Sequence, residues 1–323
     1  MDFTGDGIAD ILSGCYWSDD PDCPNGNAQA GYIYVLAGTE EGSFSRATPL
    51  LTADDKPLTN IPLSREQLEN YDSGSIEWAN ICTSQFAVDY DADGDLDLVV
   101  GEMGNKFYLH LNSAKSASAA PVFADKPTAL EVELPEQHSD PHLVDWDDDG
   151  DLDLLSGSSS GSVYLSLNEG SATDPKWADF ECLIKNEMTW SQTTDDGAEL
   201  KLGHGVRVCV TDFNRDGKLD VLAGDATTIE NEIPNLSAKE AKKLKKEYDE
   251  EMQPIQDEMQ KLYEKYEADV EKADGDKDAE SELLEKMKES RKELAEKMLV
   301  VMEKEKLFRD NVATGHVWVY LQK

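Results

Sequence analysis

The sequence predicts a mainly β fold with an inserted helical hairpin, and three observations support this prediction. An acidic loop occurs four times, each time directly before a short apolar run that ends in Gly. Outside residues 235–308 the chain holds 21 of its 22 glycines, separated by short runs of Val, Ile, Leu and Tyr, a pattern typical of strands joined by turns. Inside residues 235–308, apolar residues recur every three or four positions, as in an α-helix. We therefore predict a β domain (residues 1–234 and 309–323) and a helical insertion (residues 235–308).

The overall charge restricts the partners of this chain. It carries 30 Lys and Arg residues against 68 Asp and Glu residues, a net charge of −38. Because such a field repels phosphate groups, it argues against nucleic acids and anionic membrane surfaces as partners. No segment approaches the roughly 20 apolar residues that a membrane-spanning helix needs, so no span is predicted. Cations, neutral ligands such as carbohydrates, and proteins remain.

The four acidic loops begin at Asp2, Asp89, Asp145 and Asp212 and share the pattern D-x-[DNT]-x-D-G-x-x-D. Side-chain oxygens at positions 1, 3, 5 and 9 and a backbone carbonyl at position 7 can converge on one cation, and Gly at position 6 permits the sharp turn. Without a cation, the carboxylates would repel one another strongly. Because the loops offer many oxygens and no thiolate or imidazole, we predict Ca2+, up to four ions, rather than magnesium or a soft metal.

The predicted ligands occupy the odd-numbered positions of each loop. They are Asp2, Thr4, Asp6, Ile8 and Asp10; Asp89, Asp91, Asp93, Asp95 and Asp97; Asp145, Asp147, Asp149, Asp151 and Asp153; and Asp212, Asn214, Asp216, Lys218 and Asp220. The residues expected to bind through their backbone carbonyls are Ile8, Asp95, Asp151 and Lys218. We expect the first loop to bind most weakly because Thr4 is uncharged, and Asn214 gives the fourth loop a similar deficit.

An EF-hand is the closest rival to this interpretation. That motif needs Glu at position 12 and a helix on each side. Here position 12 is small or apolar, as at Ser13, Val100 and Ala223, and apolar runs that read as strands flank the loops. The pattern therefore indicates a strand-loop-strand calcium site.

The helical block begins with Ser237 and Glu240 at the spacing of a capping box. One apolar stripe runs from Leu244 to Tyr266 and a second from Leu284 to Val301, with a break at residues 273–276, which predicts an antiparallel, coiled-coil-like hairpin. Pro254 is expected to kink the first helix or divide it in two. Two interpretations stay open: the stripes pack on each other, or they form a contact surface for a protein partner or a second copy.

The repeated unit resembles the FG-GAP/VCBS repeat. The loop, the following strand and its Gly are followed by a second strand pattern at residues 31–36, 106–112, 161–168 and 315–321. That repeat builds the β-propeller of integrin α-subunits and of many secreted bacterial proteins, and the whole chain most resembles FG-GAP proteins of planctomycete-type bacteria. The resemblance implies a calcium-binding β-propeller with four countable blades. A complete small ring, an open arc and a fragment of a larger ring all remain open.

The resemblance also implies a place outside the cytoplasm: secreted, periplasmic or at the cell surface. The chain opens without a signal peptide, so we expect a mature or trimmed form of a longer protein. We expect a binding, adhesion or scaffold module in which the helical hairpin contacts proteins, with self-association through the hairpin as one form of that contact. The alternative is a polysaccharide-active hydrolase or lyase, although no catalytic residue is predicted: the histidines are scattered and no H-E-x-x-H or G-x-S-x-G motif occurs.

Cysteine and aromatic residues give weaker signals. A Cys15–Cys23 bridge and a set of five idle thiols are both open interpretations. Tyr16, Trp17, Trp78, Trp177 and Trp190 are candidates for stacking on sugars or a protein partner. Trp146 and Trp318 are expected to fill the spaces between blades.

Overall fold

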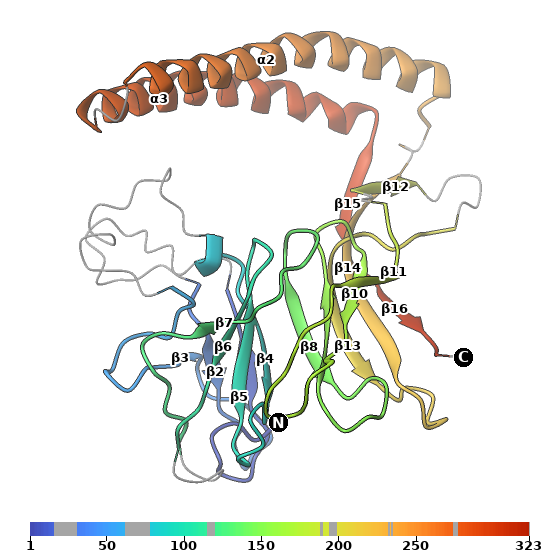
Figure 1. Ribbon diagram of the computed structural model, residues 1–323. Helices are drawn as coiled ribbons and strands as arrows, with labels where there is room; N and C mark the ends of the chain where they lie inside the picture. The colour runs from blue at the N-terminus through green and yellow to red at the C-terminus, as the bar shows by residue number, and fades with distance from the viewer. Residues whose placement is uncertain are drawn as a thin grey trace. The chain divides into compact units, whose positions relative to one another are not determined.

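The computed structural model describes residues 1–15, 31–61, 78–114, 120–187, 190–193, 199–231, 233, 235–273 and 277–322. The chain divides into two compact units (Figure 1). The β unit comprises Met1–Trp190, Lys201–Thr227 and Gly315–Lys323, and the helical unit comprises Ser191–Leu200 and Thr228–Thr314. The predicted helical block, residues 235–308, lies inside the helical unit.

The strands form four sheets, which confirms the prediction of a mainly β fold. The first sheet contains β1 (Ile11–Ser13), β2 (Tyr34–Leu36) and β3 (Thr48–Pro49). The second contains β4 (Ser84–Val88), β5 (Asp97–Gly101), β6 (Phe107–His110) and β7 (Thr128–Ala129). The third contains β8 (Asp140–Val144), β9 (Asp153–Gly157), β10 (Val163–Ser166) and β11 (Glu181–Ile184). These three sheets are antiparallel in sequential order.

The fourth sheet is built around β14 (Asp220–Asn231). In the β unit, the first part of β14 pairs antiparallel with β13 (His204–Thr211) and β16 (Val317–Tyr320). In the helical unit, its last part pairs in parallel with β12 (Ser191–Thr193), and β15 (Asp310–Thr314) also pairs with β14. One long strand therefore belongs to both units.

Apolar cores lie between successive sheets, because alternate side chains of a strand face opposite sides. In β5, Leu98 and Val100 pack toward the first sheet, whereas Val99 packs toward the third. In β9, Leu154 packs toward the second sheet and Leu155 toward the fourth. Both faces of the two middle sheets are thus covered, which explains why these strands read as continuous apolar runs.

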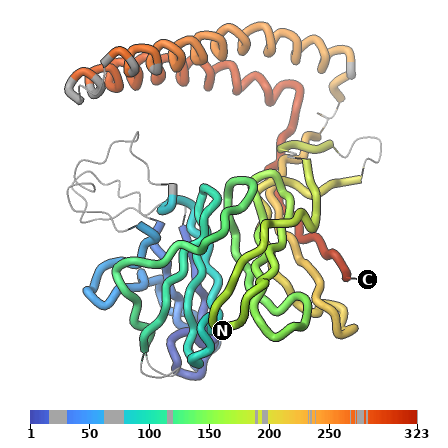
Figure 2. The backbone as a smooth tube through the Cα atoms, in the orientation of Figure 1, coloured from blue at the N-terminus to red at the C-terminus, as the bar shows by residue number. Residues whose placement is uncertain are grey.

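The strands β4, β8 and β13 lie next to one another in chain order (Figure 2). On β8, Asp140 accepts a hydrogen bond from the backbone N–H of Val208 on β13 (2.7 Å), and His142 Nε2 accepts one from Val210 (3.3 Å). Side chains of one strand therefore satisfy donors on the edge of the next strand. Burial lowers the pKa of His142 to about 4, so the ring stays neutral in this structural role.

Glycine permits the close approach of neighbouring sheets at three equivalent positions. Gly14, Gly101 and Gly157 lie at or just beyond the end of the strand that follows their acidic loop. A side chain at any of them would overlap a backbone carbonyl in or just before the first strand of the next sheet. The three carbonyls are those of Thr83, Ser139 and Val206. The Gly of the repeat is therefore a packing requirement between sheets.

The helical unit contains the predicted hairpin, α2 (Ala238–Ala273) and α3 (Lys277–Met302), with the short 3-10 helix η3 (Glu303–Leu307) after it; another, η1 (Trp78–Asn80), lies in the β unit. The capping box is confirmed: Ser237 N–H donates to Glu240 Oε2 (3.2 Å), and Glu240 N–H donates to Ser237 Oγ (3.3 Å). Lys304 Nζ contacts Glu251 (2.5 Å), so the C-terminal end of the hairpin returns to the first half of α2.

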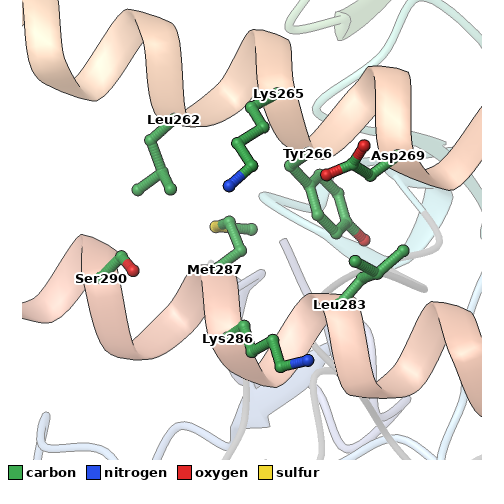
Figure 3. Close-up of a pocket in the computed structure, with 8 residues that line it drawn as sticks. All are labelled: Leu262, Lys265, Tyr266, Asp269, Leu283, Lys286, Met287 and Ser290. Carbon is green, nitrogen blue, oxygen red and sulfur yellow. The ribbon is translucent and has the colours of Figure 1, made fainter.

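The two stripes pack on each other in part. Met252, Leu294 and Val301 are buried, whereas a small cavity of about 100 Å3 remains between Leu262 and Tyr266 of α2 and Met287 of α3 (Figure 3). Pro254 was expected to kink the first helix or to divide it: division is wrong, because α2 continues through this residue, and the kink stays a prediction. Pro254 lies on the exposed face of α2, where water can bind the carbonyl that loses its helical partner.

Candidate metal sites

All four acidic loops are attached to their sheets in the same way. The Asp at position 9 is buried in each loop, and one of its carboxylate oxygens accepts a backbone hydrogen bond from position 2. These donors are Phe3 (2.9 Å), Tyr90 (2.9 Å), Trp146 (2.8 Å) and Phe213 (3.1 Å). The other oxygen accepts from a backbone N–H just beyond the next strand of the sheet. Those donors are Gly38 (2.8 Å), Asn112 (2.7 Å), Asn168 (2.8 Å) and Gln322 (3.0 Å).

The backbone of the loops is also repeated. The Asp at position 1 accepts a hydrogen bond from the N–H of the Gly at position 6 in every loop, as between Asp89 and Gly94 (3.2 Å). That Gly has a positive φ in all four loops, for example 95° at Gly94. Position 4 is also left-handed, with Ala92 at 62° and Arg215 at 63°. Each loop therefore folds back on itself, so that the backbone of position 6 lies against the carboxylate of position 1.

Carboxylates converge in the second and third loops. In the second loop, oxygens of Asp89, Asp91 and Asp97 lie within 4.8 Å of one another, and in the third the same holds for Asp145, Asp147 and Asp149. Buried oxygens without a hydrogen-bond partner lie in the same loops. They are Oδ1 of Asp89, Asp95 and Asp151, and Thr4 Oγ1 lies similarly in the first loop. An all-oxygen set with unsatisfied acceptors fits a hard cation of the calcium type.

The carboxylates in the second and third loops repel one another. Burial, with the nearby carboxylates of Asp91 and Asp95, raises the pKa of Asp97 to about 6, although the N–H groups of Asn112 and Tyr90 counteract the rise. Burial and the neighbouring loop carboxylates also raise the pKa of Asp95 and of Asp151. The metal-free loops thus hold anions in places that disfavour negative charge.

The first and fourth loops hold less charge. In the first, burial acts to raise the pKa of Asp10, but hydrogen bonds from the backbone of Gly38, Thr4 and Phe3 outweigh it, so this pKa is lowered. In the fourth, Asn214 Nδ2 donates to Asp216 Oδ2 (3.0 Å), which occupies an oxygen that would otherwise face a cation. The converging carboxylates lie in the second and third loops, and the expectation that the first loop binds calcium most weakly stays a prediction.

Two features of these loops, the burial of the side chain at position 7 and the second contact of the Asp at position 9, are not among the predictions from the sequence. Asp95 and Asp151 were expected to act through their carbonyls, but their side chains are also buried and carry unpartnered oxygens. The Asp at position 9 also ties its loop to a strand later in the sheet. The apolar run directly after position 9 indicates this second contact, because it places an Asp such as Asp97 or Asp153 at the first residue of a buried strand.

The other candidate residues have structural contacts or lie outside the described residues. His110 is buried, and burial lowers its pKa to about 3; His316 N–H donates to Asp225 Oδ1 (2.7 Å). Trp146 and Trp318 pack in the core between the third and fourth sheets, as predicted. Trp177 packs in the core between the second and third sheets. Trp190 is 59% exposed and lies over His204 with ring centroids 4.0 Å apart.

Tyr16, Trp17 and Cys23 lie outside the described residues, and nothing is described of the side chain of Trp78. The Cys15–Cys23 bridge and the stacking roles of these aromatic residues therefore stay predictions.

The repeated loop and its sheet are the features by which this chain is similar to known proteins. Residues 145–223 match the family model of the FG-GAP-like repeat. The match begins at the third loop and extends through the fourth loop into β14, so it includes one of the two loops in which three carboxylates converge. No curated protein and no solved structure matches the chain.

FG-GAP-like repeats are typical of extracellular proteins and suggest a binding or adhesion-type module. Within the described residues, no helix combines the length and the apolar character that crossing a membrane requires.

Proposed function

We propose that this chain is a calcium-stabilised extracellular binding or scaffold module, in which the four sheets are successive blades of an FG-GAP/VCBS-type β-propeller. The convergence of carboxylate oxygens in the second and third loops, with buried oxygens left unpartnered, carries the proposal. Asp89, Asp91, Asp97, Asp145 and their counterparts would hold the ions. Bound calcium would neutralise the loops and hold in place the start of the strand that follows each loop. In this proposal calcium stabilises the fold of the β unit, and the exposed surfaces of the protein bind its partners.

Calorimetric titration of the metal-free protein with calcium tests the metal sites. We expect two strong sites, assigned to the second and third loops, and weaker uptake by the first and fourth. Asp93→Asn combined with Asp149→Asn should abolish the strong uptake. Each Asp accepts a backbone hydrogen bond that an Asn oxygen can still accept (3.0 Å from Asp95 N and 3.1 Å from Asp151 N), so the pair of substitutions removes charge and leaves the turn intact.

A matched control is Glu131→Gln combined with Asp179→Asn, two exposed acids outside the loops. This variant has the same net charge as the loop variant and should bind calcium like the wild type. Equal uptake by the loop variant and the control would show that calcium binds through the general negative field, and the proposed sites would then be wrong.

The helical hairpin is proposed to be a protein-contact element. Near the end of α3, Leu299 is 61% and Val300 68% exposed, and Leu307 in η3 is 56% exposed. Leu299 also lines a cavity of about 580 Å3, together with Ile233, Met302, Glu303, Glu305, Lys306, Arg309, Asp310 and Asn311. The insertion carries 16 basic and 22 acidic residues, so its weak net charge allows it to approach another acidic protein.

Replacing residues 235–308 with a short Gly-Ser linker tests this role. Since β14 and β15, which flank the insertion, pair with each other, a short linker can join them, and closing a longer loop costs only about 0.6 kcal/mol per doubling of length. We expect calcium uptake and the melting of the β unit to stay unchanged, and contacts made through the hairpin to be lost. The readout is sedimentation velocity together with calcium calorimetry. Unfolding of the β unit in this variant would contradict the role and place the hairpin in the core.

A further inference from the structure

The face of the fourth sheet that points away from the third sheet has no covering sheet in the described part of the β unit. The opposite face packs against the third sheet through Val221, Ala223, Trp318 and Tyr320. Strand pairing sets Leu222 opposite Val319 and Gly224 opposite Val317, and opposed residues share a face. The uncovered face, here called the forward face, is therefore formed by Leu222, Gly224, Val317 and Val319, with Cys209 and Arg207 of β13 beside them.

Equivalent positions in the two preceding sheets are buried. In the second sheet, Phe107 and Leu109 are 0% and 8% exposed, and in the third sheet Val163 and Leu165 are 0% and 9% exposed. The matching residues of the fourth sheet, Val317 and Val319, are 69% and 40% exposed. The fourth sheet thus presents the apolar surface by which the earlier sheets receive a neighbour.

Gly224 is the fourth member of the glycine series. At Gly14, Gly101 and Gly157, a side chain would overlap the next sheet, whereas at Gly224 the nearest atom, the carbonyl oxygen of Arg207, is 3.9 Å from the position of a Cβ. Within its own sheet, a side chain at position 224 would therefore fit without overlap. The absence of a side chain at Gly224 leaves room for the close approach of another backbone, as at the other three glycines.

The first sheet also has a face that no sheet covers among the residues that the structure describes, here called the rear face. Leu12 and Val35 pack toward the second sheet, so their alternating neighbours Ile11, Ser13, Tyr34 and Leu36 lie on the other side. Ile11 is 43% exposed, whereas Leu98, at the same position in the second sheet, is fully buried. In the described part of the β unit, the row of four sheets therefore leaves one largely apolar face uncovered at each end.

We propose that a second copy of this chain covers these faces, with the rear face of one copy packed on the forward face of the other. Three successive sheet-to-sheet contacts within the chain already use the same surfaces, and the proposed contact continues that series between copies. Because the two faces differ, the contact is head-to-tail, and a pair with twofold symmetry satisfies both ends at once. This proposal rests on the β unit alone and requires no contact through the hairpin.

Sedimentation equilibrium of the full chain in calcium and at physiological ionic strength, which screens the net charge, tests the proposal. We expect a dimer. Val319→Lys on the forward face and Ile11→Lys on the rear face should each weaken association by about tenfold or more, because each buries a charge in an apolar contact. Leu183→Lys is the matched control: Leu183 is 40% exposed on β11, an edge strand of the third sheet, which carries neither face, and its substitution should leave the dimer intact. Melting curves in calcium check that each variant is folded.

Mixing the two variants gives the decisive result. A head-to-tail contact leaves one intact interface in the mixture, namely the rear face of the Val319→Lys chain on the forward face of the Ile11→Lys chain. Heterodimers should therefore form at higher affinity than either variant self-associates. A monomeric wild type, or a dimer unaffected by Val319→Lys, would overturn the proposal. A dimer that is lost in Leu299→Lys but kept in Val319→Lys would also overturn the proposal and would assign the contact to the hairpin. Calcium calorimetry on the same samples shows separately whether the metal sites bind.

Discussion

Removing calcium with a chelator at pH 7 is expected to lower the melting temperature of the β unit by about 10 °C or more. A metal ion that binds only the folded state adds about 2.7 kcal/mol per site when free metal exceeds Kd a hundredfold. The two strong loops together therefore contribute about 5 kcal/mol, and each kcal/mol shifts the melting of a domain of this size by roughly 2–4 °C. Differential scanning calorimetry with calcium and with chelator measures the shift.

The same experiment has a pH dependence with a definite sign. The pKa of Asp97 in the metal-free fold is raised to about 6, so the neutral form stabilises the metal-free fold at low pH. That stability is fully present below the unfolded-state pKa of about 3.9 and is lost as pH rises through about 6. The loss caused by chelation should therefore be smaller at pH 5 than at pH 7, where calcium also binds more strongly.

Asp95→Asn separates repulsion from metal binding. The Asp95 carboxylate is buried among like charges, so the substitution should raise the melting temperature in chelator and reduce the gain on adding calcium. Glu131→Gln, an exposed acid outside the loops, is the control and should change neither value. An identical melt with and without chelator would mean that the backbone hydrogen bonds of the loops suffice to hold them.

Gly157→Val is expected to destabilise the β unit by about 3 kcal/mol or more, or to prevent its folding. The new side chain would overlap the carbonyl oxygen of Val206 on the neighbouring sheet. Backbone in a packed sheet cannot move aside as a flexible side chain can, so the overlap becomes strain. Urea unfolding in saturating calcium, followed by circular dichroism, measures the loss.

Gly224→Val is the matched control, because the same substitution in the equivalent position of the fourth sheet meets no atom closer than 3.9 Å. At low protein concentration it should unfold at nearly the same urea concentration as the wild type. Equal stability of the two variants would show that the Gly157 contact is not required for the packing of the third sheet on the fourth.

Local patterns were sufficient to predict the strands, the loops and the helical hairpin. Strand β5, for example, follows from an apolar run with turn residues before it, and the start of α2 follows from Ser237 and Glu240, because caps and turns depend on residues a few positions apart. The continuation of α2 through Pro254 could not be predicted in this way. It depends on which side of the helix faces water, and the packing of α3 decides that.

For the candidate sites, the sequence by itself determined which oxygens could meet, since the spacing of Asp89, Asp91 and Asp97 and the turn at Gly94 lie within one short segment. Only the tertiary structure decided that Asp97 also holds Asn112 across the sheet, that Asp95 is buried, and that Gly157 and Gly224, alike in their local sequence, have different surroundings. The physical reason is that burial and close approach depend on residues distant in the chain, whereas turn geometry depends on neighbours.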